Sequence, residues 1–221
     1  MTNAEIFDFF TSQGMTPEGA CAMMGNYMAE SSMKPNIAQR GMTKLSDEQY
    51  TAAADNGLLD FPRDQVGFGY AQWTHPKRKE RLLAFAKSNG RSVGDALTQL
   101  RFTIKELKED FHTIWSDLCT SHDLFQLTQV ICNVYENPSV KNVGTRYEFA
   151  QNFYNEMTGA KKPVPVKDPI SATFPPNPSV KMIQYAMWEN GYLDDISEIN
   201  GYKSKKFFAK LREFTDDMEG C

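Results

Sequence analysis

The sequence contains few of the residues that metal-dependent and thiol-dependent enzymes use. Its 221 residues include only three histidines and four cysteines. These are His75, His112, His122, Cys21, Cys119, Cys132 and Cys221. They show neither metal-ligand spacing nor the paired spacing of a zinc site, and Cys21 stands in an apolar stretch where a structural cysteine is far more common than a nucleophile. We therefore expect no metal and no cofactor, and a zinc or cysteine peptidase is disfavoured.

The chain also lacks a large basic cluster and a long apolar run. Its formal net charge is -4 and its pI is near 5.5, and no group of basic residues is large enough to follow a phosphate backbone. No window approaches the ~20 apolar residues that span a bilayer, and the first residues do not have the pattern of a secretory signal. We expect no nucleic-acid partner, no membrane insertion, synthesis in the cytoplasm without a signal peptide, and cysteines that need no disulfide.

Proline marks the expected division of the chain. Six of the eleven prolines fall between Pro163 and Pro178, which is typical of an extended, semi-rigid linker. We expect a first domain over residues 1–160, a linker over 161–178 and a small helical module over 179–221. The alternative is that the proline-rich segment lies as a strap across the first domain.

Apolar periodicity and helix-end signals predict a mainly α fold of the α+β type, with helices around one small irregular or β lobe. The lobe is expected over residues 37–72, where no helical period is sustained and a short hairpin could form. Helices are expected over 3–13, 15–30 and from Pro76 to about Asn89. Further core helices are predicted from apolar stripes at Val93, Leu97, Leu100, Ile104, Leu107 and Phe111, at Leu124, Leu127, Ile131 and Val134, and at Phe149, Phe153 and Met157.

Glu30 is the main candidate for chemistry. It closes a helical stretch of small and apolar residues, with Tyr27, Asn26 and Met23 on the same face one and two turns back. A carboxyl held against such surface resists ionisation, as the general acid of glycoside hydrolysis must. The alternative is a glutamate at a helix end that points into water.

A second candidate segment follows about forty residues later. It runs Gly67-Phe68-Gly69-Tyr70-Ala71-Gln72-Trp73. Closely spaced glycines let a backbone approach a ligand, while tyrosine, glutamine and tryptophan offer stacking faces and an amide to a sugar. The alternatives are that the glycines only form a turn and that Trp73 only fills the core.

Together these residues carry a resemblance. The run from Gly25 to Asn36, followed by Tyr50-Thr51, Asp55-Asn56-Gly57, the Gly67–Trp73 segment with Thr74, Arg78-Lys79, Tyr135-Glu136-Asn137-Pro138 and Arg146, resembles the lysozyme-like domain of bacteriophage tail lysins and endolysins. The similarity covers about Thr16 to Gly159. More distantly, Glu30-Ser31 with the later glycine segment is similar to goose-type lysozymes and lytic transglycosylases.

The resemblance implies a peptidoglycan hydrolase of the endolysin type, acting as a monomer. Glu30 would protonate the β-1,4 bond between N-acetylmuramic acid and N-acetylglucosamine. The implied substrate-binding residues are Ser31, Tyr70, Gln72, Trp73, Tyr135 and Glu136. Release through a holin or a place on the virion tail would bring the protein to the wall, and residues 179–221 faintly resemble small peptidoglycan-binding modules.

The second catalytic group stays open at this stage. An inverting hydrolase needs a base carboxylate about 6.5 to 9.5 Å from the acid, and a retaining one needs about 5 to 5.5 Å. We favour Asp64, three residues before the glycine turn, over Asp55. Glu136 is a third possibility, with a surface position or an ion pair with Arg146 as its other interpretation.

Two other functions also stay open. A lytic transglycosylase would need no second carboxylate, because the hydroxyl of the substrate closes on the anomeric carbon. A phage tail protein that only binds the cell wall would keep a glycan-binding groove but would not cleave the glycan.

Overall fold

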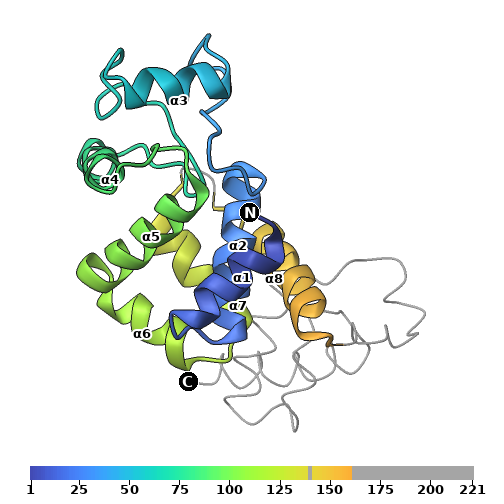
Figure 1. Ribbon diagram of the computed structural model, residues 1–221. Helices are drawn as coiled ribbons and strands as arrows, with labels where there is room; N and C mark the ends of the chain where they lie inside the picture. The colour runs from blue at the N-terminus through green and yellow to red at the C-terminus, as the bar shows by residue number, and fades with distance from the viewer. Residues whose placement is uncertain (139–140, 161–221) are drawn as a thin grey trace, which may run out of the picture. The chain divides into compact units, whose positions relative to one another are not determined.

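The computed structural model describes residues 1–138 and 141–160, and their backbone is mainly helical (Figure 1), as predicted. The elements are α1 Asn3–Ser12, α2 Pro17–Ser31, α3 Asp47–Asp55, α4 Pro76–Ser88, α5 Ala96–Asp110, α6 His112–Thr120, α7 Leu124–Val130, the π-helix η1 Ile131–Glu136 and α8 Val143–Thr158. Met1–Ala160 is one compact unit. The expected linker over 161–178 and module over 179–221 lie outside the described residues.

Helix α2 is the central element of this unit. Thr16 caps it by accepting a hydrogen bond from the Gly19 N–H at 3.0 Å, and Pro17 takes the first helical position, so the predicted start is confirmed to within two residues. Residues on all sides of the helix are buried, which is the pattern of a helix enclosed by others. Those others are α1, α6, α7, η1 and α8.

Gly25 allows α8 to lie directly against α2. A Cβ atom at this position would stand 2.6 Å from the Arg146 carbonyl oxygen and 2.7 Å from the Ala150 Cβ, both far inside van der Waals contact. The missing side chain therefore lets the two helix backbones approach closely. One consequence is that Arg146, on α8, reaches the end of α2 where Glu30 stands.

The small lobe differs from the prediction in one respect, because helix α3 lies inside the segment expected to be irregular. Ser46 and Gln49 form a reciprocal capping box at its start, and the helix buries Tyr50 and Ala54. The β structure in the lobe consists of isolated antiparallel bridges that join Ala38 to Phe68 and Phe68 to Trp73. Figure 1 shows α3 at the end of the unit away from α6.

The apolar stripe from Leu124 to Val134 is only partly a core stripe. Leu127 and Ile131 are buried, but Val134 is 51% exposed, so its predicted place in the core is wrong. The physical reason is that the chain passes from α7 into the π-helix η1, whose Asn137 N–H donates to the Cys132 carbonyl five residues back at 2.9 Å. A π-helix has more residues per turn than an α-helix, so the α-helical period no longer says which side chains face inward.

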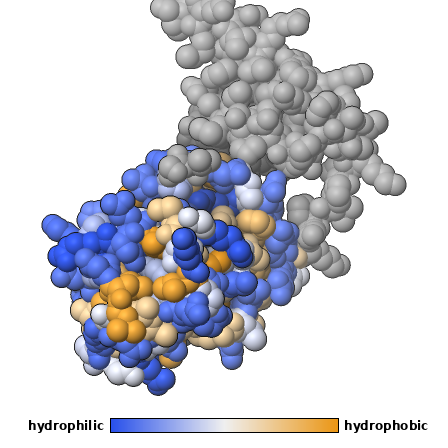
Figure 2. Space-filling view, turned by 90° about the horizontal axis from the view of Figure 1, so that it is seen from above, coloured by the Kyte–Doolittle hydropathy of each residue, from blue (hydrophilic) through white to orange (hydrophobic). Residues whose placement is uncertain are grey.

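Figure 2 shows one face of the described residues, most of it hydrophilic. On the face shown in Figure 2, apolar residues gather in one region and hydrophilic residues surround them. Large apolar residues with exposed side chains are Met1, Met42, Leu45, Leu58 and Val134. Over residues 1–138 and 141–160, none of the helices combines the length and the apolar character needed to cross a bilayer.

Candidate active site

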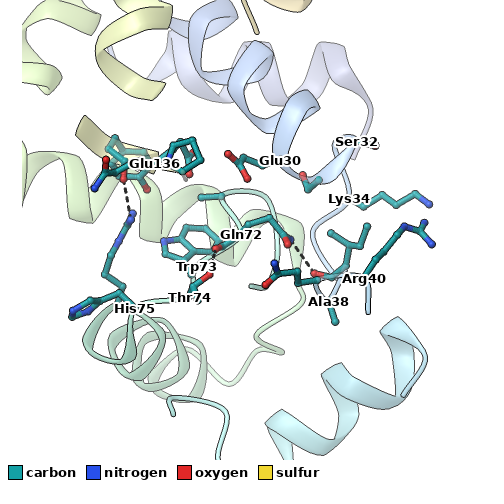
Figure 3. A pocket seen from close by; sticks show the side chains of 18 of the residues that line it. Glu30, Ser32, Lys34, Ala38, Arg40, Gln72, Trp73, Thr74, His75 and Glu136 are labelled. Atoms are coloured by element: carbon teal, nitrogen blue, oxygen red, sulfur yellow. Dashed lines mark hydrogen bonds between the residues drawn. The ribbon is translucent and has the colours of Figure 1, made fainter. Parts of the chain in front are cut away.

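A cleft of about 830 Å³ opens at the end of α2. Its walls come from the last residues of α2 and the chain that follows, the turn before α4, Phe111, and the end of η1. Glu30, Ser31, Gln72, Trp73, Tyr135 and Glu136 all line it. Figure 3 shows Glu30 and Glu136 on one side of the cleft, with Gln72 and Trp73 on the other.

Glu30 occupies the last turn of α2 and faces the cleft rather than open water. Its side chain is 15% exposed, and Tyr27 and Met23 on the same helix face are fully buried, as the sequence predicts. The surroundings are not only apolar, however. The Glu30 Oε1 atom accepts a hydrogen bond from the Arg146 Nη2 at 2.5 Å, and Arg146 also donates from Nη1 to the Asn26 Oδ1 at 3.1 Å.

Glu136 lines the same cleft with a buried carboxyl group. Both of its oxygens are buried and accept no hydrogen bond from the described residues. Burial raises the pKa of Glu136 well above its ordinary value near 4.5, the charge of Glu30 raises it further, and Arg78 and Arg146 oppose these effects. Arg146 pairs with Glu30, so the ion pair of Glu136 with Arg146 considered from the sequence is not formed, and the burial of Glu136 favours its protonated form.

A buried polar network fixes the wall beside Glu136. The fully buried Glu106 accepts from the Trp73 Nε1 at 2.9 Å and from the Tyr135 hydroxyl at 3.0 Å, and it pairs with Arg78 at 2.8 Å. Arg78 also lies 4.6 Å from the centre of the Tyr135 ring and donates to the Tyr135 carbonyl oxygen. Trp73 and Tyr135 are each 1% exposed, so their rings build the wall and do not present open stacking faces to a sugar.

The glycine segment forms a tight turn. Phe68 and Trp73 exchange two backbone hydrogen bonds, and Gly69 has a φ of 76°. A Cβ at Gly69 would stand 2.5 Å from the Gln99 side chain, so Gly69 serves the turn and this contact. Gln72 also has a positive φ, 43°, and its side chain donates to the carbonyl oxygens of Ile37 and Gly69.

Tyr70 and Ser31 both contact Tyr27 in the protein interior. The structure does not bring Tyr70 to the cleft, because its ring is 1% exposed and stacks on Tyr27 with 5.2 Å between ring centres. Ser31 lines the cleft, but its hydroxyl donates to the Tyr27 carbonyl oxygen at 2.9 Å. That bond is a local helix contact.

Asp64 also lies away from the cleft lining. It forms an ion pair with the fully buried Lys79, accepts from the Tyr50 hydroxyl at 2.6 Å and from the Val66 N–H at 3.0 Å. Lys79 donates in addition to the Val66 carbonyl oxygen at 2.7 Å. Both Asp64 oxygens are therefore used to hold the small lobe against α4, and Asp64 is not brought together with Glu30 as the sequence reasoning expected.

Several cleft residues were not singled out from the sequence. Lys34, Arg40 and His75 line the cleft, with Lys34 and Arg40 near one another at one end in Figure 3. From the sequence, Arg146 was noted as part of a motif and as a possible ion-pair partner of Glu136, but not as the partner of Glu30. In the described part of the chain, no three His, Cys, Asp or Glu side chains stand close enough together to hold a metal ion.

Comparison with known proteins gives two findings. A family model described as phage tail lysozyme matches residues 1–157. Morphogenesis protein 1 of Bacillus phage B103 is 25% identical over 163 residues, which are 70% of this chain and 38% of the relative. The chain thus spans less than two fifths of that relative's length.

Proposed function

Because this chain belongs to the phage tail lysozyme family, we propose that it cuts the glycan strands of bacterial peptidoglycan with Glu30 as the general acid. A peptidoglycan-lytic role in general comes with the family. The observation that carries the finer proposal is the position of Glu30, at the end of a buried helix and in the wall of a long cleft.

The proposed bond is the β-1,4 link between N-acetylmuramic acid and N-acetylglucosamine. A proton from Glu30 would pass to the bridging oxygen, which leaves as the 4-hydroxyl of N-acetylglucosamine. The anomeric carbon of N-acetylmuramic acid would then take a water molecule, and the product would be a reducing sugar.

The cleft also offers charges that suit this substrate. Muramic acid carries a lactyl group and a peptide stem with carboxylates. Lys34 and Arg40 are exposed at one end of the cleft, and Arg78 stands in its wall. These cations support a substrate that is a glycan with anionic branches, even though the whole chain has a net charge of -4.

The direct test is Glu30→Gln. General acid catalysis contributes about 10²–10⁴-fold to rate, so clearing of purified cell walls should fall by a factor in that range. Sedimentation with the walls should stay unchanged. Because the change removes the counter-charge of the buried Arg146, the melting temperature should fall, and clearing is therefore compared per folded molecule. Glu148→Gln, which changes an exposed glutamate of α8, is the matched control and should clear walls like the unaltered protein.

Undiminished clearing by Glu30→Gln would overturn the proposal. An unaltered protein that sediments with walls but never clears them would instead be a non-catalytic wall-binding protein of the phage tail. Cys21 does not suit the nucleophile of a cysteine peptidase, because burial raises the pKa of its thiol to about 12.

A lytic transglycosylase is the second candidate, and the position of Asp64 favours it. The carboxylate expected to activate water is held by Lys79 and Tyr50 outside the cleft. Burial of Glu136, the other carboxyl of the described cleft lining besides Glu30, favours the protonated form, which cannot activate water. An intramolecular attack by the 6-hydroxyl of N-acetylmuramic acid needs no carboxylate partner for water. Digestion in ¹⁸O-labelled water separates the two reactions, because hydrolysis adds label to the new end and the intramolecular reaction gives an unlabelled end one water molecule lighter.

The place of action that we propose is the virion tail rather than release through a holin. The family is described as a tail lysozyme, and the relative is named a morphogenesis protein. Mass spectrometry of purified virions should detect the chain, and its absence from particles, with abundance in the lysate, would restore the endolysin interpretation.

A further inference from the structure

Three buried polar atoms beside the cleft have no hydrogen-bond partner. Over residues 1–138 and 141–160, the buried side-chain nitrogen and oxygen atoms without a partner are Glu136 Oε1, Glu136 Oε2 and Arg146 Nε. An unpaired buried polar group costs about 1–3 kcal/mol, and more if it is charged. Their concentration on two residues that both interact with Glu30 points to a function that the resting arrangement does not display.

Arg146 is only partly used in this arrangement. Its Nη2 donates to Glu30 at 2.5 Å and its Nη1 donates to Asn26 at 3.1 Å, while Nε donates to no described residue. A guanidinium group has five N–H donors in a fixed fork and can serve two carboxyl groups. Arg146 therefore has an unused donor on the group that already binds Glu30.

Charged groups on four helices interact electrostatically with Glu136. These are Glu30 on α2, Arg78 on α4, Glu106 on α5 and Arg146 on α8, and it in turn affects the titration of Tyr27, Cys132 and Tyr135. The interaction with Glu30 comes directly after burial in its effect on Glu136. Two carboxyl groups in one cleft lining, with Arg146 bonded to only one of them, can share a single proton.

This arrangement also answers a difficulty in the proposed function. A general acid must hold its proton when the substrate arrives, yet Glu30 forms an ion pair with Arg146. Glu136, by contrast, has both carboxyl oxygens buried without a partner, which favours its protonated form. The cleft lining thus contains a second carboxyl group that can hold the proton needed at Glu30.

We propose that Glu136 is a positioning residue that supplies the proton to Glu30, with Arg146 as the counter-ion of whichever carboxyl is ionised. The proposal rests on Glu30 being the general acid of the reaction. In the resting arrangement Arg146 binds the Glu30 carboxylate. In the reactive arrangement the proton has moved to Glu30, and the unused Nε of Arg146 binds the new carboxylate of Glu136.

The proton balance closes over one turnover. The O–H bond of Glu136 breaks and an O–H bond forms at Glu30, directly or through a water molecule. Glu30 then gives the proton to the bridging oxygen as the glycosidic bond breaks. The attacking hydroxyl, from water or from the 6-position of the sugar, returns one proton to the pair, while Arg146 stays charged throughout.

The test is the pH profile of wall clearing by the full chain with Glu136→Gln. Without the Glu136 carboxyl, no neighbouring group supplies a proton to Glu30, and the ion pair with Arg146 stabilises the ionised form of Glu30. The alkaline limb of the kcat profile should therefore move down by at least about one pH unit, the coupling at which two sites titrate as a pair. Glu136→Asp keeps a carboxyl and should restore most of the original limb, and Glu148→Gln should leave the limb in place.

A purely structural Glu136 would change the melting temperature without moving the limb, and that result would overturn the proposal. If Glu136→Gln fails to fold, ¹³C-carboxyl NMR of the unaltered protein decides instead. The proposal requires the chemical shifts of the Glu30 and Glu136 carboxyl carbons to change with pH in two coupled steps. A single independent step at Glu30 would contradict it. Loss of clearing in Glu30→Gln with an unmoved limb in Glu136→Gln would reject this inference alone, whereas full clearing by Glu30→Gln would reject the proposed function.

Discussion

At the scale of single residues, two carboxyl groups expected to act together stand in different surroundings. Glu30 faces the cleft beside Arg146, while Asp64 is held by Lys79, Tyr50 and Val66. The sequence shows that both residues are acidic and lie near motif segments. It cannot show that Lys79, fifteen residues after Asp64, turns inward and takes that carboxylate as its counter-ion.

Asp64→Asn should therefore harm stability more than catalysis. The change leaves the buried Lys79 ammonium without its counter-charge, and breaking a buried ion pair costs about 3–5 kcal/mol. Urea denaturation should show a loss of that size in the free energy of unfolding. Wall clearing per folded molecule should stay within a few-fold of the unaltered protein.

Asp60→Asn is the matched control for this change. Asp60 pairs with Arg63 at 3.7 Å on the surface, where both side chains are more than half exposed, so stability should hardly change. A well-folded Asp64→Asn protein that loses clearing as completely as Glu30→Gln would return Asp64 to the catalytic machinery.

Glu136 should give the folded protein a characteristic pH dependence. Its pKa is raised in the folded state, so the folded chain holds a proton that the unfolded chain releases above about pH 4.5. The free energy of unfolding should fall as the pH rises above that value, by up to about 1.4 kcal/mol per pH unit from this group. Glu136→Gln removes this contribution, so the variant should gain stability relative to the unaltered protein as the pH rises above about 4.5.

Urea denaturation at several pH values measures the difference between the two proteins. A difference that does not change with pH would show that Glu136 ionises normally in the folded state. Glu148→Gln, at an exposed position of α8, should show no such trend.

At the scale of helices and turns, local signals were reliable where they were specific. The cap at Thr16 with Pro17 and the proline at position 76 predicted the starts of α2 and α4 to within two residues. Helix α3 was missed because its nine residues show no sustained apolar period, although the Ser46–Gln49 capping box was visible in the sequence. The prediction that Val134 faces inward was wrong, because no feature of the sequence period marks the change from α-helix to π-helix at Ile131.

The contact between α2 and α8 at Gly25 offers a test at this scale. Alanine at position 25 would gain about 1 kcal/mol of helix propensity. The Cβ would, however, meet backbone atoms of α8 at 2.6–2.7 Å, and overpacking costs about 1–3 kcal/mol. Gly25→Ala should therefore lower the free energy of unfolding, and clearing per folded molecule should fall because α8 carries Arg146 away from Glu30.

Gly90→Ala is the comparison that separates stability from activity. Gly90 has a φ of 61° and open space around it, so alanine there strains the backbone without touching the cleft. Its stability should fall while its clearing per folded molecule stays unchanged. Equal activity losses in both variants would contradict the role given to the α2–α8 contact.

At the scale of the whole molecule, the sequence predicted the fold class and the position of Glu30 better than the composition of the cleft. Helices can be predicted from the local pattern of residues, and an acidic residue at a predicted helix end can be identified directly from the sequence. The inward packing of Trp73, Tyr135 and Tyr70 depends on Glu106 and Tyr27, which lie far away in sequence. Aromatic type alone does not distinguish a sugar-stacking face from a ring in the core.

The central claim is that the cleft cuts the glycan between N-acetylmuramic acid and N-acetylglucosamine, and end-group analysis of digested walls tests it most directly. Purified peptidoglycan is treated with the full chain or with Glu30→Gln, and the new ends are identified by mass spectrometry before and after borohydride reduction. The account predicts new ends made of N-acetylmuramic acid, reducing or in the anhydro form, that are absent from the Glu30→Gln digest. New N-acetylglucosamine reducing ends, or intact glycans with cleaved peptides, would contradict it.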